Sequence, residues 1–183
     1  DGNGYQDDIH GWDFANNDSN PMDDHSHGTH CSGTMAGIGN NYIGVTGVNW
    51  TSELVAMKFL DDGGSGFVSD AVDAIYYSVA MGCKLTSNSW GGGDYSPELA
   101  TAIEYANSKG CLFIAAAGNE TNNNDASPAY PASYTSDNII AVAAIDHNDV
   151  IASFSNYGLS SVDLGAPGVS IYSTVLSGGY TSY

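Results

Sequence analysis

The fold is decided by residues 85–120, which read LTSNSWGGGDYSPELATAIEYANSKGCLFIAAAGNE. Two short apolar runs, Leu85–Ser89 and Leu112–Ala117, enclose a segment with the period of an amphipathic helix. Ser96 is a candidate N-cap for that helix, a proline follows it at the first helical position, and Gly110 marks the end. A strand, a helix and a second strand in this order are typical of parallel strands joined by a crossover helix. The stretch therefore predicts an α/β fold.

The same alternation of apolar runs and helical segments begins at Glu53 and continues beyond residue 120. The other candidate strands are Leu54–Leu60, Ile139–Ala144 and Val162–Leu164. A second helix is expected from its N-cap Ser69 to Gly82, with one face formed by Val72, Ile75, Tyr76 and Val79. A third is expected from His27 through Gly37, where small residues predict close packing against a neighbour.

The chain is strongly acidic. Its 183 residues include 21 Asp and Glu against three Lys and Arg, for a formal net charge of −18. Nucleic acid and anionic membrane are therefore poor partners. Two interpretations of the acidity stay open: the solvated surface of an extracellular or salt-exposed protein, or carboxylates that hold calcium, which prefers oxygen ligands.

The length suits one domain, and no apolar run approaches the roughly 20 residues of a membrane helix. We expect a soluble chain whose export signal would lie outside these residues. Three cysteines, Cys31, Cys83 and Cys111, are an odd number, so at least one is a free thiol or pairs elsewhere. Cys83 and Cys111 are candidate neighbours, or small buried apolar side chains.

Three segments contain side chains suited to chemistry. SHGTHCSGT, residues 26–34, places His27 at the start of a helix, where it is structural or, with His25 and His30, part of a metal cluster. AAAGNE, residues 115–120, presents the Asn119 amide, an ordinary turn residue or a donor to an oxygen that becomes negative during acyl transfer. SNSWGGG, residues 87–93, leaves backbone groups uncovered, as an edge that pairs with an extended peptide does.

Together and in this order, the motifs resemble the subtilase family, both subtilisin and proteinase K. They are HGTHCSGT, SNSWGGG, AAAGNE, SPAYPASY, ASFSNYG and LGAPGVSIYST, and they run from about Asp23 to the end of the chain. The resemblance implies a doubly wound, mostly parallel α/β sheet with helices on both faces. It also implies that residues 1–183 form a partial subtilisin-like peptidase domain, incomplete at both ends.

The resemblance implies a serine endopeptidase that hydrolyses peptide bonds through an acyl-enzyme. His27 would be its general base, and Asn119 would donate its side-chain amide to the tetrahedral oxyanion. Cys31 matches a thiol that proteinase K-like members keep beneath the catalytic histidine, and Pro131 is a candidate cis-proline.

The resemblance also assigns a channel that binds substrate as an added strand. One side would be Ser89, Trp90 and Gly91, and the other Gly64, Ser65 and Gly66. The primary specificity pocket would be walled by Ala115, Ala116, Ala117 and Gly118, with Glu120 and Ala129 near its far end. Val68 and Trp90 would border the pocket further along the peptide. Small residues there leave room for a large apolar or aromatic side chain, while Glu120 suits a basic one.

Two motifs of the family are not found in the 183 residues. The catalytic aspartate belongs in a motif like D-[ST]-G on the first strand, and Asp1, Asp7, Asp8 and Asp13 do not match it. The nucleophilic serine belongs in G-T-S-M-A, expected shortly after Tyr183, and Ser177 and Ser182 do not replace it. Because the site needs all three roles, we expect these residues alone to be inactive.

Calcium is the expected cofactor, in a structural role. Residues 1–8, DGNGYQDD, place oxygen ligands Asp1, Asn3, Tyr5, Asp7 and Asp8 among glycines that allow sharp turning; the alternative is an acidic solvated loop. The resemblance adds Asp163, which matches a carboxylate of a cation site, with backbone carbonyls near 132–138.

The leading hypothesis is a secreted, calcium-stabilised, monomeric endopeptidase that acts on polypeptides, with any propeptide or accessory domain outside these residues. One alternative is a non-catalytic module of the same fold that binds peptide at Ser89–Gly91. The other is an acidic calcium-binding surface protein with structural histidines, which would show no affinity for peptide aldehydes.

Overall fold

A computed structural model of the chain describes residues 2–183. They form two compact units, residues 2–74 with 170–183, and residues 75–169. Helix α2, Val68–Ala80, crosses from one unit to the other. Within the described residues, no helix has the length and apolar character needed to cross a membrane.

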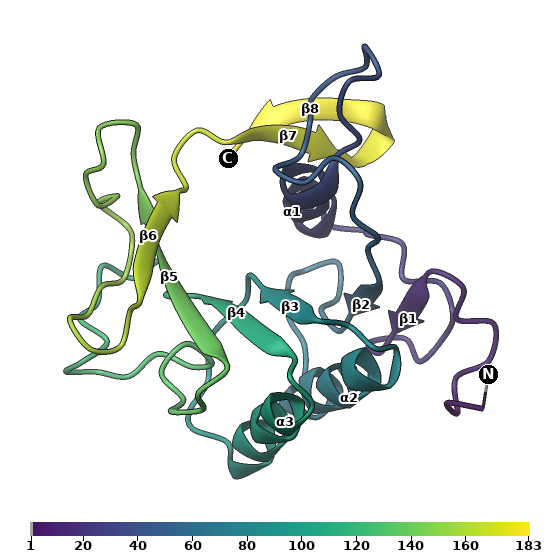
Figure 1. Cartoon of the computed structure of the whole chain (residues 1–183), viewed down its shortest axis with the longest axis horizontal. Coiled ribbons are helices and arrows are strands. Elements are labelled where there is room, and N and C mark those ends of the chain that lie inside the picture. Colours follow the sequence, from purple (N-terminus) through teal and green to yellow (C-terminus); the bar gives the residue numbers. More distant parts are fainter. Residues whose placement is uncertain (1) are drawn as a thin grey trace. The chain divides into compact units, whose positions relative to one another are not determined.

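The first unit contains two small sheets and one helix (Figure 1). Its elements are β1 (Gly11–Asp13), α1 (His27–Ala36), β2 (Ala56–Lys58), β7 (Tyr172–Val175), a 3-10 turn (Leu176–Gly178) and β8 (Gly179–Ser182). Strands β1 and β2 pair in parallel, and β7 and β8 form an antiparallel hairpin. The Lys58 ammonium on β2 lies 3.2 Å from carboxylates of Asp13 and Asp24, which joins β1 to the segment before α1.

Helix α1 packs closely on β7, as its small residues predict. A Cβ on Gly33 would lie 2.0 Å from Thr174 Oγ1 and 2.6 Å from Ser173 Oγ. Those hydroxyls donate hydrogen bonds to the carbonyls of Thr29 and His30, so they are fixed in place. Glycine at position 33 is what lets helix and hairpin approach to this distance.

The second unit is built on a four-stranded parallel sheet in the order β3-β4-β5-β6 (Figure 1). Its strands are β3 (Leu85–Asn88), β4 (Leu112–Ala116), β5 (Ile139–Ile145) and β6 (Leu164–Pro167). The fully buried side chains of Ile103, Phe113 and Ala115 mark the core between α3 (Pro97–Ser108) and the sheet. Parallel strands linked through α3 confirm the α/β fold.

Helix α3 begins where the sequence predicts. Ser96 Oγ accepts a hydrogen bond from Leu99 N at 3.2 Å, and proline stands at the first helical position. The helix ends one residue before Lys109, and Gly110 follows in the left-handed region with φ 72°. These signals are local to the helix, so the sequence alone reveals them.

The expected boundaries of α2 and β6 were wrong in part. Helix α2 begins at Val68 because the carbonyl of Phe67 accepts the first helical amides, and Ser69 lies inside the helix instead of capping it. Tyr76 is exposed, while Tyr77 is buried on the core side. Strand β6 runs Leu164–Pro167 instead of 162–164; it is an edge strand, where glycine and proline are tolerated.

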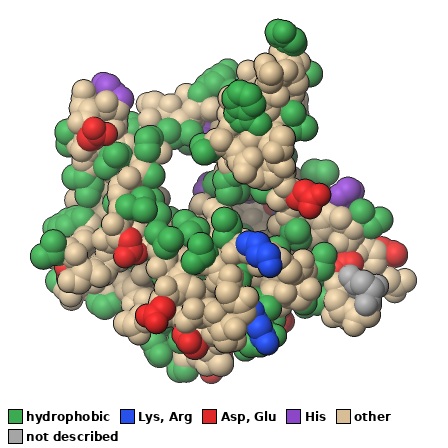
Figure 2. Space-filling model, in the orientation of Figure 1, with side chains coloured by type: hydrophobic (Ala, Val, Ile, Leu, Met, Phe, Trp, Pro, Cys, Tyr) green, Lys and Arg blue, Asp and Glu red, His purple; other side chains and the backbone are tan. Residues whose placement is uncertain are grey.

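The acidic side chains form no single patch on the face shown in Figure 2, where they are dispersed among hydrophobic and other side chains. Within each unit the carboxylates that make contacts are used locally, as in Asp13, which receives hydrogen bonds from both amides of Asn16. Burial raises the pKa of the Asp13 carboxyl, but the hydrogen bonds from Asn16 and the charge of Lys58 outweigh burial. The pKa of Asp13 is therefore below its usual range. Unlike Asp13, most acidic side chains among residues 2–183 are exposed, so much of the charge is solvated.

Candidate active site

His27 is the first residue of α1, and its side chain is exposed. The helix start is not capped by Ser26, which has φ 78° and no side-chain capping bond. Asp23 takes that role: one carboxylate oxygen accepts the amides of His25 and Ser26, and the other accepts Thr29 N at 2.7 Å and Thr29 Oγ1 at 2.6 Å. A negative charge at a helix N-terminus is stabilising, so Asp23 fixes the turn that carries His27.

The imidazole of His27 has one polar neighbour on its own helix. Its Nε2 lies 3.8 Å from Cys31 Sγ, one turn further along α1. The hydrogen bond with Cys31 raises the pKa of His27 above its ordinary value; burial lowers it and the negative charge of Asp23 raises it further. The position expected for Cys31 beside this histidine is thus the one found.

His30 is a structural residue. It is buried, and its Nε2 donates to the carbonyls of Ile171 at 2.9 Å and Thr181 at 3.3 Å, while its ring stacks on Tyr183 at 4.5 Å. No group of three or more His, Cys, Asp or Glu side chains that could hold a metal occurs among residues 2–183. The alternative of a histidine metal cluster at residues 25–30 is therefore wrong.

The segment predicted to form one side of a substrate channel is an exposed loop before α2. Asp61 shapes it, because its Oδ1 accepts the amides of Gly63 at 3.0 Å and Ser65 at 2.9 Å. A Cβ on Gly66 would lie 2.2 Å from the carbonyl oxygen of Phe59, so that position requires glycine. Val68, 42% exposed, follows at the start of α2.

The segment predicted to form the other side of the substrate channel follows β3, an edge strand of its sheet. Ser89 and Gly91 are exposed. Asn88 anchors the strand end: its Nδ2 donates to the Ile114 carbonyl at 3.1 Å, and its Oδ1 accepts Trp90 Nε1 at 3.2 Å. An exposed chain after an edge strand suits the pairing with an extended peptide that the sequence predicts.

Asn119 lies in the turn after β4, where Gly118 has φ 116°. Its side chain is exposed and makes no hydrogen bond within residues 2–183, so the amide is available to a ligand. Its backbone N–H donates to Glu120 Oε2 at 2.9 Å. Of the predicted pocket wall, Ala115 and Ala117 are buried, while Ala116 is exposed and Gly118 half-buried.

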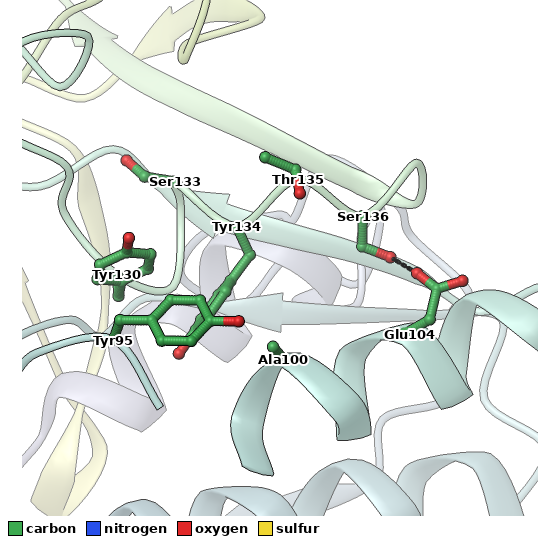
Figure 3. Close-up of a pocket in the computed structure, with 8 residues that line it drawn as sticks. All are labelled: Tyr95, Ala100, Glu104, Tyr130, Ser133, Tyr134, Thr135 and Ser136. Atoms are coloured by element: carbon green, nitrogen blue, oxygen red, sulfur yellow. Dashed lines mark hydrogen bonds between the residues drawn. The ribbon is translucent and has the colours of Figure 1, made fainter. Parts of the chain in front are cut away.

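Ala129 belongs to a loop held by tyrosines. Its backbone N–H donates to Ser133 Oγ at 3.0 Å, and the peptide bond before Pro131 is cis, as predicted. The rings of Tyr95, Tyr130 and Tyr134 lie 4.6–5.5 Å apart and line the pocket of Figure 3. Glu104 and Ser136 are hydrogen-bonded at its rim (Figure 3). No predicted pocket residue lines this cavity.

Two groups of predicted calcium ligands lie in different units. Asp1 is outside the described residues. Asn3 donates from Nδ2 to Asp8 Oδ2 at 2.7 Å, and Gly2 and Gly4 adopt φ of 86° and 94°, which gives the sharp turning expected. The Tyr5 ring packs edge-on against Trp12, with the ring centroids 5.0 Å apart.

Asp163 is exposed, and its Oδ2 accepts the amide of Ala141 on β5 at 2.8 Å. Its own amide donates to the Ala141 carbonyl at 2.9 Å. The Asp163 carboxylate is therefore held against β5.

The model of the subtilase family matches residues 1–183. The chain belongs to the subtilase family. Thermitase from Thermoactinomyces vulgaris is 43% identical over 174 residues, 95% of this chain and 60% of thermitase. A thermophilic serine proteinase from Bacillus sp. (strain AK1) is 43% identical over 172 residues, 94% of this chain and 41% of that protein.

Among solved structures, a cold adapted subtilisin-like serine proteinase matches this subtilase chain with a TM-score of 0.82 and 34% identity. The match covers 94% of this chain and 59% of that one. The subtilisin-like α/β fold is thereby confirmed. The chain spans about three fifths or less of the length of these three relatives.

Two residues of this subtilase chain that fix the candidate site are not identified by the sequence. Asp23 lies three positions before Ser26, and its acidic side chain near a helix start is a weak signal that a capping search extended upstream would find. Asn156, in ASFSNYG, bonds to the Asn119 turn 36 residues earlier. No local pattern marks a contact over that distance.

Proposed function

We propose that the protein containing this chain is a serine endopeptidase of the subtilisin type. His27 takes the proton from a serine hydroxyl as it attacks the peptide carbonyl, and returns it to the leaving amine. The Asn119 side-chain amide donates to the oxyanion that forms. The aspartate and the serine of the triad belong to motifs that residues 1–183 do not contain.

One observation carries the proposal: the two side chains that the family motifs assign to catalysis are both exposed at the ends of fixed elements. His27 opens α1, and Asp23 accepts hydrogen bonds from His25, Ser26 and Thr29 on either side of it. Asn119 follows β4, and its side-chain amide makes no hydrogen bond within the described residues. An exposed imidazole and an exposed amide at the ends of regular elements suit the general base and the oxyanion donor of acyl transfer.

Polypeptides are the proposed substrates, and each unit offers an exposed segment to an extended peptide: Gly64–Gly66 in the first unit and Ser89–Gly91 in the second. The exposed position of both segments and the edge position of β3 support this. Secretion is proposed from the net charge of −18, typical of a solvated surface. Calcium is proposed as a structural ligand at residues 1–8 and at Asp163, because the donors there are oxygen atoms and glycines turn the first segment.

The test of the proposed class is labelling of the protein expressed from the full gene by a fluorophosphonate, which reacts with an activated serine. We expect labelling that peptide aldehydes prevent. Absence of labelling in folded protein that still binds a peptide aldehyde, or any extended peptide, would identify the non-catalytic module instead. Calcium binding without affinity for peptides would identify the acidic surface protein.

A further inference from the structure

Asn156 is fully buried, and its side chain satisfies all of its hydrogen-bonding capacity on one turn. Its Oδ1 accepts Glu120 N at 2.8 Å and Asn122 N at 3.0 Å. Its Nδ2 donates to the Ala117 carbonyl at 3.0 Å and to Glu120 Oε2 at 2.8 Å. A buried polar side chain with four partners in six residues of another segment fixes the path of that segment.

These bonds enclose Asn119 from both sides. The carbonyl of Gly118 accepts the backbone amide of Asn156 at 2.9 Å, and a Cβ on Gly118 would lie 2.2 Å from Asn156 Nδ2. On the other side, Glu120 Oε2 accepts both Asn119 N at 2.9 Å and Asn156 Nδ2 at 2.8 Å. Both peptide groups that set the direction of the Asn119 side chain are therefore held, directly or through Glu120, by Asn156.

The direction of the Asn119 side chain depends on this turn, because the side chain makes no hydrogen bond of its own among residues 2–183. Its amide is free within residues 2–183, so only the backbone aims it. A donor to an oxyanion is effective when it is already in place, and a displacement of about 1 Å costs about 10²-fold in rate.

We propose that Asn156 is a positioning residue for catalysis, which aims the Asn119 amide through the Gly118–Glu120 turn. The inference rests on the proposed function, since it assigns Asn119 to the oxyanion. It gives the Glu120 carboxylate a second role, as the link between Asn156 and the Asn119 amide.

A second buried asparagine provides the matched control. Asn124 is 2% exposed, and its Nδ2 donates to the same Ala117 carbonyl at 2.8 Å, while its Oδ1 accepts Asn122 Nδ2 at 2.9 Å. It makes no side-chain bond to residues 118–120 among those described. Loss of Asn124 removes buried hydrogen bonds of the same unit without releasing the turn.

The experiment compares Asn156→Ala and Asn124→Ala in the protein expressed from the full gene, with kcat, KM and Tm for a peptide p-nitroanilide. We expect both to lower Tm. Asn156→Ala lowers kcat by about 10-fold to 100-fold with KM changed less than threefold, because the oxyanion forms only in the transition state. Asn124→Ala leaves kcat within about threefold. Equal kcat losses in the two variants, or a loss confined to KM, would overturn the proposal.

A second variant decides the case if Asn156→Ala does not fold. Asn156→Asp keeps the acceptor for Glu120 N and Asn122 N, but its other oxygen then faces the Ala117 carbonyl and Glu120 Oε2, so both donated hydrogen bonds are lost. We expect kcat to fall at least tenfold with KM changed less than threefold. A kcat equal to that of Asn124→Ala would contradict the role.

The proposed function has its own outcome in the same experiment. If the unmodified protein does not cleave the substrate or label with a fluorophosphonate, the endopeptidase assignment fails. If the unmodified protein is active and Asn156→Ala matches it, only the positioning role fails.

Discussion

At the scale of single residues, two polar side chains hold the turns that carry the proposed catalytic residues: Asp23 the turn before His27, and Asn156 the turn of Asn119. Asp23 gives one prediction: Asp23→Asn should destabilise the protein by about 1 kcal/mol, because an amide nitrogen then faces the helix amides. Burial raises the pKa of the Asp23 carboxyl, but hydrogen bonds from Thr29, His25 and Ser26 outweigh burial and lower this pKa below its ordinary value.

The difference in stability between wild type and Asp23→Asn depends on pH in a definite direction. A lowered folded pKa stabilises the protein above the unfolded pKa of about 3.9, and this stabilisation is lost as pH falls through the folded value. The gap in Tm between wild type and Asp23→Asn should therefore be constant above about pH 5 and shrink below it. Asp62→Asn, at an exposed loop position, is the control and should show no gap. A gap that grows on acidification would contradict the account.

At the scale of elements, the close contact of α1 with β7 gives a second prediction. Gly33→Ala should destabilise by about 1–3 kcal/mol, since its Cβ would displace two hydroxyls that are hydrogen-bonded to the helix. Gly28→Ala, in the same helix, meets no atom closer than 3.6 Å and should be neutral or stabilising. Urea unfolding of both variants measures this. Equal effects would show that packing on β7 is not the reason for glycine at position 33.

Elements with local signals were predictable, and those defined by distant contacts were not. Helix α3 has its cap, its proline and its terminal glycine within its own sequence. Strand β1 and the β7–β8 hairpin were not predicted, because three or four residues carry little periodicity and their pairing depends on segments far along the chain. For the candidate site, His27 and Asn119 came from motifs, while Asn156 acts through side-chain bonds that a motif does not encode.

At the scale of the whole molecule, family membership extends over all 183 residues, and the acidic composition gives a third prediction. If calcium is bound at residues 1–8, EDTA should lower Tm, and calcium at about 100 times its Kd should raise it by about 5 °C or more. Asp8→Asn should reduce the rise, and Asp94→Asn, an equal change of charge at an exposed loop, should not. A Tm that calcium and EDTA leave unchanged would rule out the structural ion.

The most direct test of the central claim is the effect of His27→Ala on peptide hydrolysis by the protein expressed from the full gene, with His25→Ala as the matched control. His25 is an exposed neighbour whose ring lies 6.5 Å from that of His27. We predict that His27→Ala lowers kcat by about 10⁴-fold or more with Tm nearly unchanged, and that His25→Ala keeps kcat within about threefold. Similar activity in the two variants would contradict a subtilisin-type mechanism centred on His27.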